Sequence, residues 1–327
     1  MSRSVRFHEF GGPEVLKIEN VVVPEPGPKE VRLRIKAIGL NRSELLTRSG
    51  KSITKPALPA GLGLEAAGFV EALGSDVDGL AVGDRVAVIP DGFGRGYYGE
   101  VALAPARTLT KMPPDQTWQD AAATWMAFGT AWAGLIDIAG LSTGRTVLIT
   151  AASSSTGLAA IQIVRKVGAT PIALTRTSAK KAALIEAGAS HVIASEEQDL
   201  VEEVARLTGG KGAEVVFDAV GGPTFEKLTH ATAIRGLLLS YGRLSPDATP
   251  LPIAQLLWKG LTIQGFNLPD AIAREDKLAE LKQFVGDGLA SGTLRPAIAR
   301  TFAFEQIVAA HRYVETGTQV GKVVVTI

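Results

Sequence analysis

Apolar and charged residues alternate along residues 31–38, which read V-R-L-R-I-K-A-I. This period of two predicts a β-strand with one buried and one solvated face. Glycine and proline interrupt the sequence on both sides of this segment, so we expect the first third of the chain to consist of strands and turns. The apolar run at residues 322–327 predicts another strand, which we expect to rejoin the N-terminal part.

The pattern changes after residue 146. An apolar run, a short turn and a helical pattern repeat at intervals of roughly 22 residues, which is typical of parallel βαβ units. We expect strands near Val147–Thr150, Pro171–Thr175, Val192–Ile193, Glu214–Ala219 and Leu237–Tyr241. The helix after the first strand carries an apolar stripe and should end at Gly168. A second helix should bury one aromatic face, formed by Trp125, Phe128 and Trp132.

Composition excludes several kinds of chemistry. The chain has no cysteine, which rules out disulfides, thiolate metal ligands and cysteine nucleophiles. A net charge of +1 gives no sign of a nucleic-acid-binding surface. No segment resembles a signal peptide or a membrane span, so we expect a cytoplasmic protein without a membrane partner. The four histidines lack ligand spacing, and each is expected at the surface or the core edge.

A turn rich in small residues follows the first strand of the βαβ region. It contains Ala152, Ser153, Ser154, Ser155, Thr156 and Gly157. A strand, a small-residue turn and a helix form the geometry in which backbone amides meet a dinucleotide pyrophosphate. The serines would also suit a turn that merely caps a helix, and the two interpretations are compatible.

The next turn bears on the choice of cofactor. In this position NAD-binding domains carry an acidic residue for the ribose diol. Here the chain reads Thr175, Arg176, Thr177, Ser178, Ala179, Lys180 and Lys181, with no carboxylate before Glu186. Cations and hydroxyls suit a 2′-phosphate, so we predict NADPH, with Thr175, Arg176, Thr177 and Lys181 as ligands. For Lys180 or Lys181 taken individually, a solvated position at the start of a helix is an equally good explanation.

Five landmarks extend over the chain: G-L-E-A-A-G-F-V from Gly63, V-G-D-R-V from Val82, the turn at Ala151, L-I-E-A-G-A from Leu184 and G-K-V-V from Gly321. Together they resemble the medium-chain dehydrogenase/reductase family. The resemblance implies an α/β protein with a GroES-like β domain and a Rossmann domain, that is, a doubly wound parallel sheet, and an active site in the cleft between them. We expect the GroES-like catalytic domain at residues 1–124, the NADPH-binding domain at 125–264 and a segment returning to the catalytic domain at 265–327.

Zinc-dependent members of this family carry Cys-Arg-Ser/Thr-Asp and Gly-His-Glu motifs. The corresponding stretches here begin at Asn41 and Gly63, so Asn41 stands for the cysteine and Leu64 for the histidine. The resemblance therefore implies a zinc-free enzyme. Without a Lewis acid, alcohol oxidation is difficult, whereas hydride transfer to a conjugated carbonyl compound needs mainly orientation and a hydrogen-bond donor.

The resemblance also implies roles for individual residues. Asn41 and Ser43 would act in catalysis, although Asn41 could simply cap the loop and Ser43 could bond the backbone. Tyr97 and Tyr98 would meet the substrate, because the two family tyrosines after the asparagine are replaced by Leu46 and Ser52. Glu65 is expected to be a structural hydrogen-bond partner rather than a base. Further cofactor contacts are expected from Arg42, Thr130, Tyr241, Phe266, Asn267 and Lys322.

The favoured function is NADPH-dependent reduction of a small quinone or activated alkene, such as an enone or enal. Reduction of an enoyl thioester is one alternative. A crystallin-like NADPH-binding protein with little turnover is another. The segment Leu261–Phe266 reads as an exposed strand, so we expect a homodimer in which such strands pair.

Overall fold

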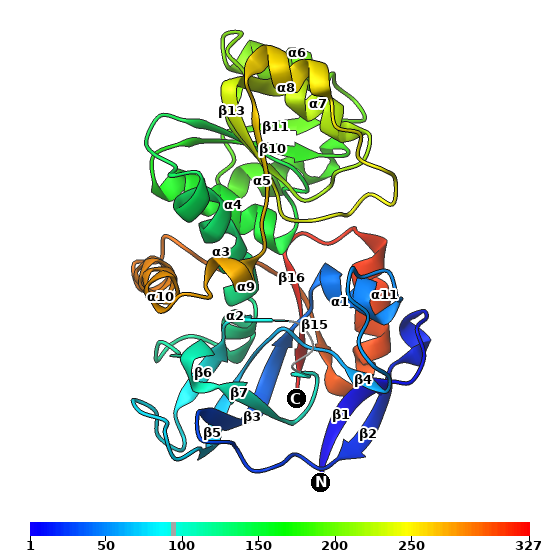
Figure 1. Ribbon diagram of the computed structural model, residues 1–327, viewed down its shortest axis with the longest axis vertical. Helices are drawn as coiled ribbons and strands as arrows, with labels where there is room; N and C mark the ends of the chain where they lie inside the picture. Colours follow the sequence, from blue (N-terminus) through cyan, green and yellow to red (C-terminus); the bar gives the residue numbers. More distant parts are fainter. Residues whose placement is uncertain (93–95) are drawn as a thin grey trace. The chain divides into compact units, whose positions relative to one another are not determined.

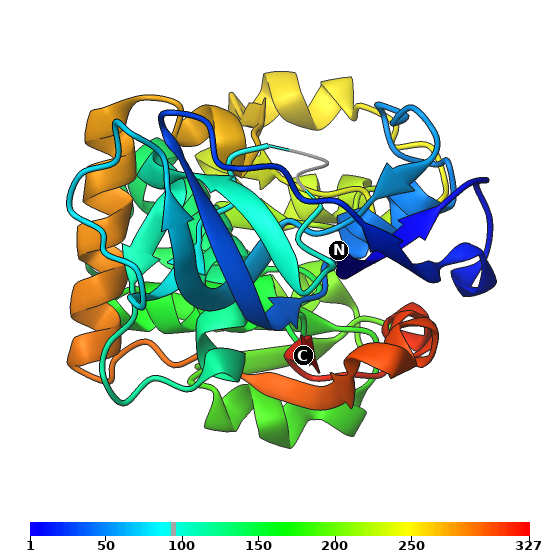
Figure 2. The same cartoon turned by 90° about the horizontal axis from the view of Figure 1, so that it is seen from below.

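The computed structural model describes residues 1–92 and 96–327, which form two compact units. The first unit comprises Met1–Met126 and Arg295–Ile327, and the second comprises Ala127–Leu294. In Figures 1 and 2 the red C-terminal strand belongs with the blue and cyan N-terminal strands, as expected for a chain that returns to its first unit.

The first unit is mostly β-structure. A seven-stranded sheet has the order β15-β16-β3-β5-β6-β8, with β7 paired to β3, and a smaller sheet has the order β2-β1-β4. Its strands are β1 (Ser2–Phe7), β2 (Lys17–Val21), β3 (Glu30–Gly39), β4 (Ala60–Gly61), β5 (Glu65–Leu73), β6 (Arg85–Val88), β7 (Val101–Pro105), β8 (Leu109–Lys111), β15 (Ile298–Ala303) and β16 (Lys322–Thr326). Its helices are α1 (Arg42–Arg48), α2 (Trp118–Ala122) and α11 (Ile307–Thr316). The predicted strand at 31–38 is thus confirmed within β3, whose Val31, Leu33 and Ile35 are buried.

The second unit contains a parallel six-stranded sheet of order β11-β10-β9-β12-β13-β14. The strands are β9 (Thr146–Ile149), β10 (Thr170–Thr175), β11 (His191–Ala194), β12 (Ala213–Asp218), β13 (Thr232–Ser240) and β14 (Thr262–Gly265). The helices are α3 (Trp125–Trp132), which begins at the end of the first unit, α4 (Ser155–Lys166), α5 (Lys181–Glu186), α6 (Leu200–Leu207), α7 (Thr224–Ala231), α8 (Ile253–Lys259), α9 (Leu268–Ala271) and α10 (Glu275–Ala290). The five predicted strands and the helix that ends before Gly168 are confirmed.

The return to the first unit begins at Arg295 rather than at the expected residue 265. Helices α9 and α10 stay with the second unit because they pack on α3. A Cβ atom placed on Gly129 would lie 2.9 Å from Leu268 and 3.6 Å from Leu281. In addition, Lys277 forms a 2.9 Å ion pair with Asp137. These packing contacts carry no periodic signal that could separate the two units in the sequence.

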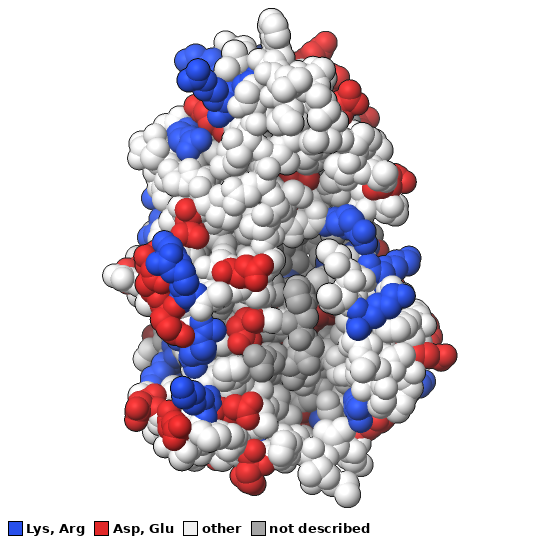
Figure 3. Space-filling view, viewed as in Figure 1, with Lys and Arg blue, Asp and Glu red and all other residues white. Residues whose placement is uncertain are grey.

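Both signs of charge occur on the face drawn in Figure 3, and much of that face carries neither. No helix in the described part of the chain is long and apolar enough to cross a membrane.

A polar chain crosses the apolar core of the first unit. His311, expected at the surface or the core edge, is fully buried there. Its Nδ1 lies 3.0 Å from the Arg48 guanidinium, and its Nε2 lies 3.3 Å from the Tyr98 hydroxyl. Because arginine can only donate, Nδ1 accepts and Nε2 carries the proton. The Tyr98 hydroxyl in turn donates to Glu44 at 2.8 Å. His311 is therefore held neutral and in one tautomer.

This arrangement predicts an acid-sensitive fold. Burial, with the nearby Arg48 charge, lowers the pKa of His311 to about 3. The pKa of a histidine in an unfolded chain is about 6.5. Below that pH the unfolded chain binds more protons than the folded protein, so the free energy of unfolding falls as the pH falls. Burial raises the pKa of Glu44 to about 7, which has the opposite effect between about pH 7 and about pH 4.5 and masks part of the His311 contribution.

Comparison of the wild type with His311→Gln isolates the contribution of His311 to the pH dependence of the unfolding free energy. The wild type should lose about 2 kcal/mol of unfolding free energy relative to the variant between about pH 7 and about pH 5, measured by denaturant unfolding. His191→Gln, which changes an exposed histidine, is the matched control and should follow the wild type. Parallel pH profiles for wild type and His311→Gln would contradict the interpretation.

Candidate functional site

The turn between β9 and α4 has the geometry of a phosphate-binding turn. The Ser154 hydroxyl caps α4 by accepting a 3.0 Å hydrogen bond from the Gly157 amide. Ala151 has a positive φ of 45°. A Cβ atom on Gly157 would lie 2.6 Å from the Ala152 Cα, so only glycine fits this close approach. The first amides of α4, at Ser155 and Thr156, have no acceptor within the helix and suit an anion.

Asp218 is a residue that the sequence analysis missed. Its buried carboxylate accepts hydrogen bonds from the Thr150 hydroxyl at 2.7 Å and from the amides of Val220 and Gly221 at 3.0 and 2.9 Å. It thereby joins the ends of β9 and β12, where the strand order of the sheet reverses. Ligands of such sheets bind at this reversal. The signal was a carboxylate at the end of an apolar strand, followed by Gly221 and Gly222.

The turn after β10 brings Lys180 to the phosphate turn, and Arg176 lies near Lys180. Lys180 is half-buried and its ammonium lies 3.2 Å from the Ser153 hydroxyl. Burial and the nearby Arg176 charge lower the pKa of Lys180. Lys181, which we selected from the sequence, is exposed on the first turn of α5. The geometry thus favours Lys180 over Lys181 as the partner of an anion, because only Lys180 lies against the turn.

An aromatic group lies where the chain leaves β12, β13 and β14. Tyr241 stacks on Phe217 with ring centroids 4.2 Å apart, and its ring centroid lies 6.0 Å from that of Phe266. The Tyr241 hydroxyl is buried and has no hydrogen-bond partner in the described part of the chain. Burial raises the pKa of this hydroxyl, so it stays protonated and can donate to a ligand.

The other predicted residues of the second unit have these positions. Thr130 is buried in α3, Thr175 ends β10, Thr177 is exposed after it, and Asn267 caps α9 by accepting from the Asp270 amide at 3.0 Å. Together the tight turn at Gly157, the cations after β10 and the free Tyr241 donor fit a dinucleotide with an additional phosphate.

In the first unit, Asn41 belongs to a buried ionic group. Lys322 donates to Glu65 Oε1 at 2.5 Å and to Asn41 Oδ1 at 2.7 Å. Asn41 Nδ2 donates to Gly39 O and to Glu65 Oε1, each at 3.2 Å. Glu65 also accepts from the Met126 amide at 2.9 Å, which confirms the expected structural role of Glu65. Both amide hydrogens of Asn41 are therefore in use.

Two expectations change as a result. Asn41 was expected to orient a substrate carbonyl, but it has no amide hydrogen left to donate. Lys322 was expected to contact the cofactor, but it is about 1% exposed and neutralises Glu65. In this arrangement both side chains contribute to the fold, because their hydrogen bonds to each other and to Glu65 complete the buried ionic group.

Ser43 lies on the first turn of α1 and is half-buried. Its hydroxyl has no hydrogen-bond partner among the described residues, whereas its backbone carbonyl accepts from Thr47. Arg42, the first residue of α1, is exposed and donates to the Val314 carbonyl at 3.2 Å. Of the residues predicted for catalysis, Ser43 is thus the one with a hydroxyl available to a ligand.

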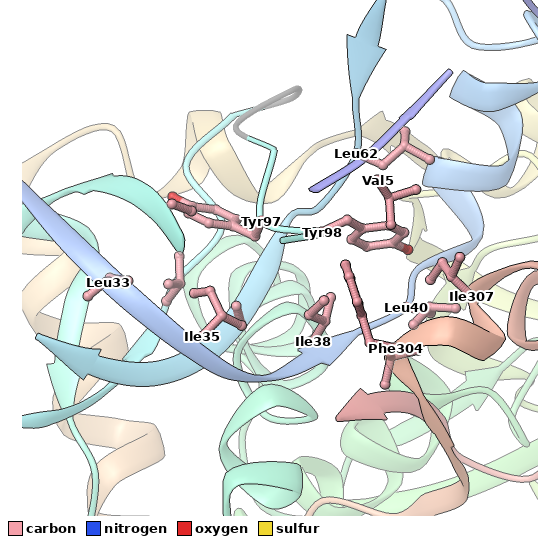
Figure 4. Packing of buried hydrophobic residues seen from close by; sticks show 14 of the residues in the cluster. Val5, Leu33, Ile35, Ile38, Leu40, Leu62, Tyr97, Tyr98, Phe304 and Ile307 are labelled. Carbon is pink, nitrogen blue, oxygen red and sulfur yellow. The ribbon is translucent and has the colours of Figure 1, made fainter. Parts of the chain in front are cut away.

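Tyr97 and Tyr98 do not have the positions expected of substrate contacts. They are 1% and 0% exposed, and Figure 4 shows both rings among the apolar side chains of the core. The Tyr98 hydroxyl is already bonded to Glu44. Glu44 accepts as well from the amides of Asn41 and Leu64, at 2.7 and 2.9 Å, and thus fixes the start of α1. Sequence analysis missed this role of Glu44.

Comparison with known proteins places these features in a family. Residues 27–114 match the alcohol dehydrogenase GroES-like domain, and residues 155–285 match the zinc-binding dehydrogenase domain. The chain is 34% identical to the quinone oxidoreductase of Pseudomonas aeruginosa, covering 95% of each chain. It is 32% identical to the 2-haloacrylate reductase of a Burkholderia species, covering 97% of this chain and 96% of that one.

A solved structure is similar over the full length. The Escherichia coli quinone oxidoreductase in complex with NADPH superposes with a TM-score of 0.93, at 31% identity, covering 99% of this chain and 100% of that one. The domain matches, the relatives and the two-unit fold agree. The chain belongs to the medium-chain dehydrogenase/reductase family, in its quinone oxidoreductase-like group.

Proposed function

We propose that the protein is an NADPH-dependent reductase of a small quinone or activated alkene, and that it works without zinc. The single observation that carries the cofactor assignment is the position of Lys180 against Ser153, with Arg176 close by. A half-buried ammonium beside the serine hydroxyl of the phosphate turn suits the 2′-phosphate of NADPH. The similar E. coli enzyme in complex with NADPH supports the same assignment.

The remaining cofactor contacts follow from the second unit. We assign the pyrophosphate to the amides of the turn Ala152–Gly157, the 2′-phosphate to Arg176 and Lys180 with Thr175 and Thr177, and the nicotinamide end to Thr130, Tyr241, Phe266 and Asn267. The Tyr241 hydroxyl is the donor of this last group. When bound, NADPH supplies the hydride that the reaction requires.

The side chains of the first unit support zinc-free chemistry. The chain contains no cysteine, Leu64 has no ligand atom, and Asn41 is committed to Lys322 and Glu65. Among the described residues no group of three histidine or acidic side chains could hold a metal ion. Reduction of a conjugated carbonyl suits this site, because such a substrate already accepts charge and needs mainly a donor near its oxygen.

The function is tested by NADPH oxidation with 1,4-quinones, 2-alkenals and enoyl thioesters as acceptors. Turnover of a quinone or alkenal, unchanged by a strong chelator, is the expected result. Turnover of the thioester alone would indicate the enoyl reductase alternative, which the similar structure of the enoyl reductase CurK supports (25% identity, TM-score 0.90). Tight NADPH binding without turnover of any acceptor would indicate the crystallin-like alternative.

Cofactor preference is tested with a neighbouring pair of lysines. Lys180→Ala should weaken NADPH binding by about 1.5–3 kcal/mol and leave NADH binding nearly unchanged, since it removes a charged hydrogen bond to the phosphate. Arg176→Ala should act in the same direction. Lys181→Ala is the matched control and should alter neither affinity by more than about twofold. Equal affinity of the wild type for the two cofactors would contradict the assignment.

Ser43 is the residue proposed to assist the reaction. Its hydroxyl can donate to the substrate oxygen as negative charge develops there, so Ser43→Ala should lower the single-turnover rate of NADPH oxidation by about a hundredfold. Thr47→Val removes a hydroxyl one turn further along α1 and is the control. Asn41→Ala should instead lower the melting temperature, because it removes one of the two acceptors of the buried Lys322 ammonium. An unchanged rate in Ser43→Ala with normal NADPH binding would place the donor elsewhere.

We also propose a homodimer that forms at β14. This strand is the edge of the six-stranded sheet and is mostly exposed, as predicted for Leu261–Phe266. On the preceding helix α8, Leu257 and Trp258 are 76% and 86% exposed. An open strand edge beside large exposed apolar side chains suits pairing with the same surface of a second copy.

A further inference from the structure

Two neighbouring turns meet at the proposed 2′-phosphate site. Strands β10 and β11 are parallel, and their last residues, Thr175 and Ala194, are paired. The backbone pairing continues beyond the strands, since Ser195 N bonds Thr175 O at 2.8 Å and Glu196 N bonds Arg176 O at 2.9 Å. The residues that follow each strand are therefore held side by side at the ligand-binding edge of the sheet.

Glu197 occupies part of this site. Its carboxylate accepts a 2.9 Å hydrogen bond from the Ser178 amide. Hydrogen bonds from the Ser178 amide and hydroxyl lower the pKa of Glu197, so its carboxylate is ionised at neutral pH. Ser178 stands between Arg176 and Lys180 in the turn. A negative group of the chain itself thus takes two donors that lie among the cations proposed for the cofactor phosphate.

The carboxylate is not needed to hold the two turns together. The backbone bonds at Thr175 and Arg176 already do this, and Glu197 N bonds Ala194 O at 2.9 Å. The Glu197 side chain is exposed. Displacing it would break only solvated hydrogen bonds, which costs little.

We propose that Glu197 is a specificity-determining residue that narrows the preference for NADPH over NADH. The inference rests on the proposed function of the same site. The ionised carboxylate competes with the 2′-phosphate for Ser178 and repels its negative charge. The ribose 2′-hydroxyl of NADH can donate to a carboxylate, as it does to the acidic residue of NAD-binding domains. Glu197 therefore offers, from the turn after β11, the acidic group that the turn after β10 lacks.

Dissociation constants of NADPH and NADH, measured by fluorescence titration, test the proposal with two adjacent glutamates. Glu197→Gln keeps the size of the side chain and removes its charge. The ratio of NADH to NADPH dissociation constants should rise about tenfold in this variant, mainly through tighter NADPH binding. Glu196→Gln removes the same charge from an exposed neighbour and should change the ratio by less than about twofold. Glu197→Ala should change it in the same direction as Glu197→Gln.

Three outcomes would overturn the proposal. An equal change of the dissociation-constant ratio in Glu197→Gln and Glu196→Gln would show only a general effect of the lost charge. Weaker NADPH binding in Glu197→Gln would show that the carboxylate positions the turn instead. A wild type that binds neither nucleotide would overturn the proposed function and this inference together, whereas NADPH binding that is insensitive to Glu197 overturns the inference alone. Melting temperatures of all variants check that the fold is retained.

Discussion

The first unit depends on the buried ion pair between Glu65 and Lys322. Glu65 begins β5 and Lys322 begins β16, residues 257 apart in the chain, and both strands pair with β3. Neither side chain is more than 1% exposed, so either charge alone would be unfavourable by several kcal/mol. The pair therefore requires the C-terminal strand to return to the N-terminal sheet. Asn41 completes the group, which ties the start of α1 and its Ser43 to the same point.

The sequence predicted the elements that depend on local periodicity. The alternation in β3 and the apolar runs of β9 to β13 each reflect a single strand and its burial, so short windows were sufficient. The turn at Gly157 was also predictable, because close backbone approach requires glycine there. The boundary between the two units at Arg295 was not predictable, because it depends on how α9 and α10 pack on α3.

The roles of polar residues were harder to predict than their positions. Asn41 and Lys322 were assigned to ligands from family motifs, and Tyr98 was assigned in place of the missing family tyrosines. Their hydrogen bonds were already committed to partners far away in the sequence, such as Glu65 and Glu44. Lys180 and Lys181 show the same limit within one turn. These identical neighbours in the sequence differ in their contacts, because only Lys180 lies against Ser153.

The ionic group also gives a physical reason for the proposed zinc-free chemistry. By the family resemblance, Asn41 stands where zinc-dependent relatives have a cysteine ligand. Its amide oxygen accepts here from the Lys322 ammonium, whose charge Glu65 neutralises. A fixed, neutralised ammonium is a hydrogen-bond donor and no Lewis acid, so it cannot lower the pKa of a bound alcohol as a metal does. The buried cation of the first unit thus serves the fold, and the proposed substrates are ones that are electrophilic without activation by a metal.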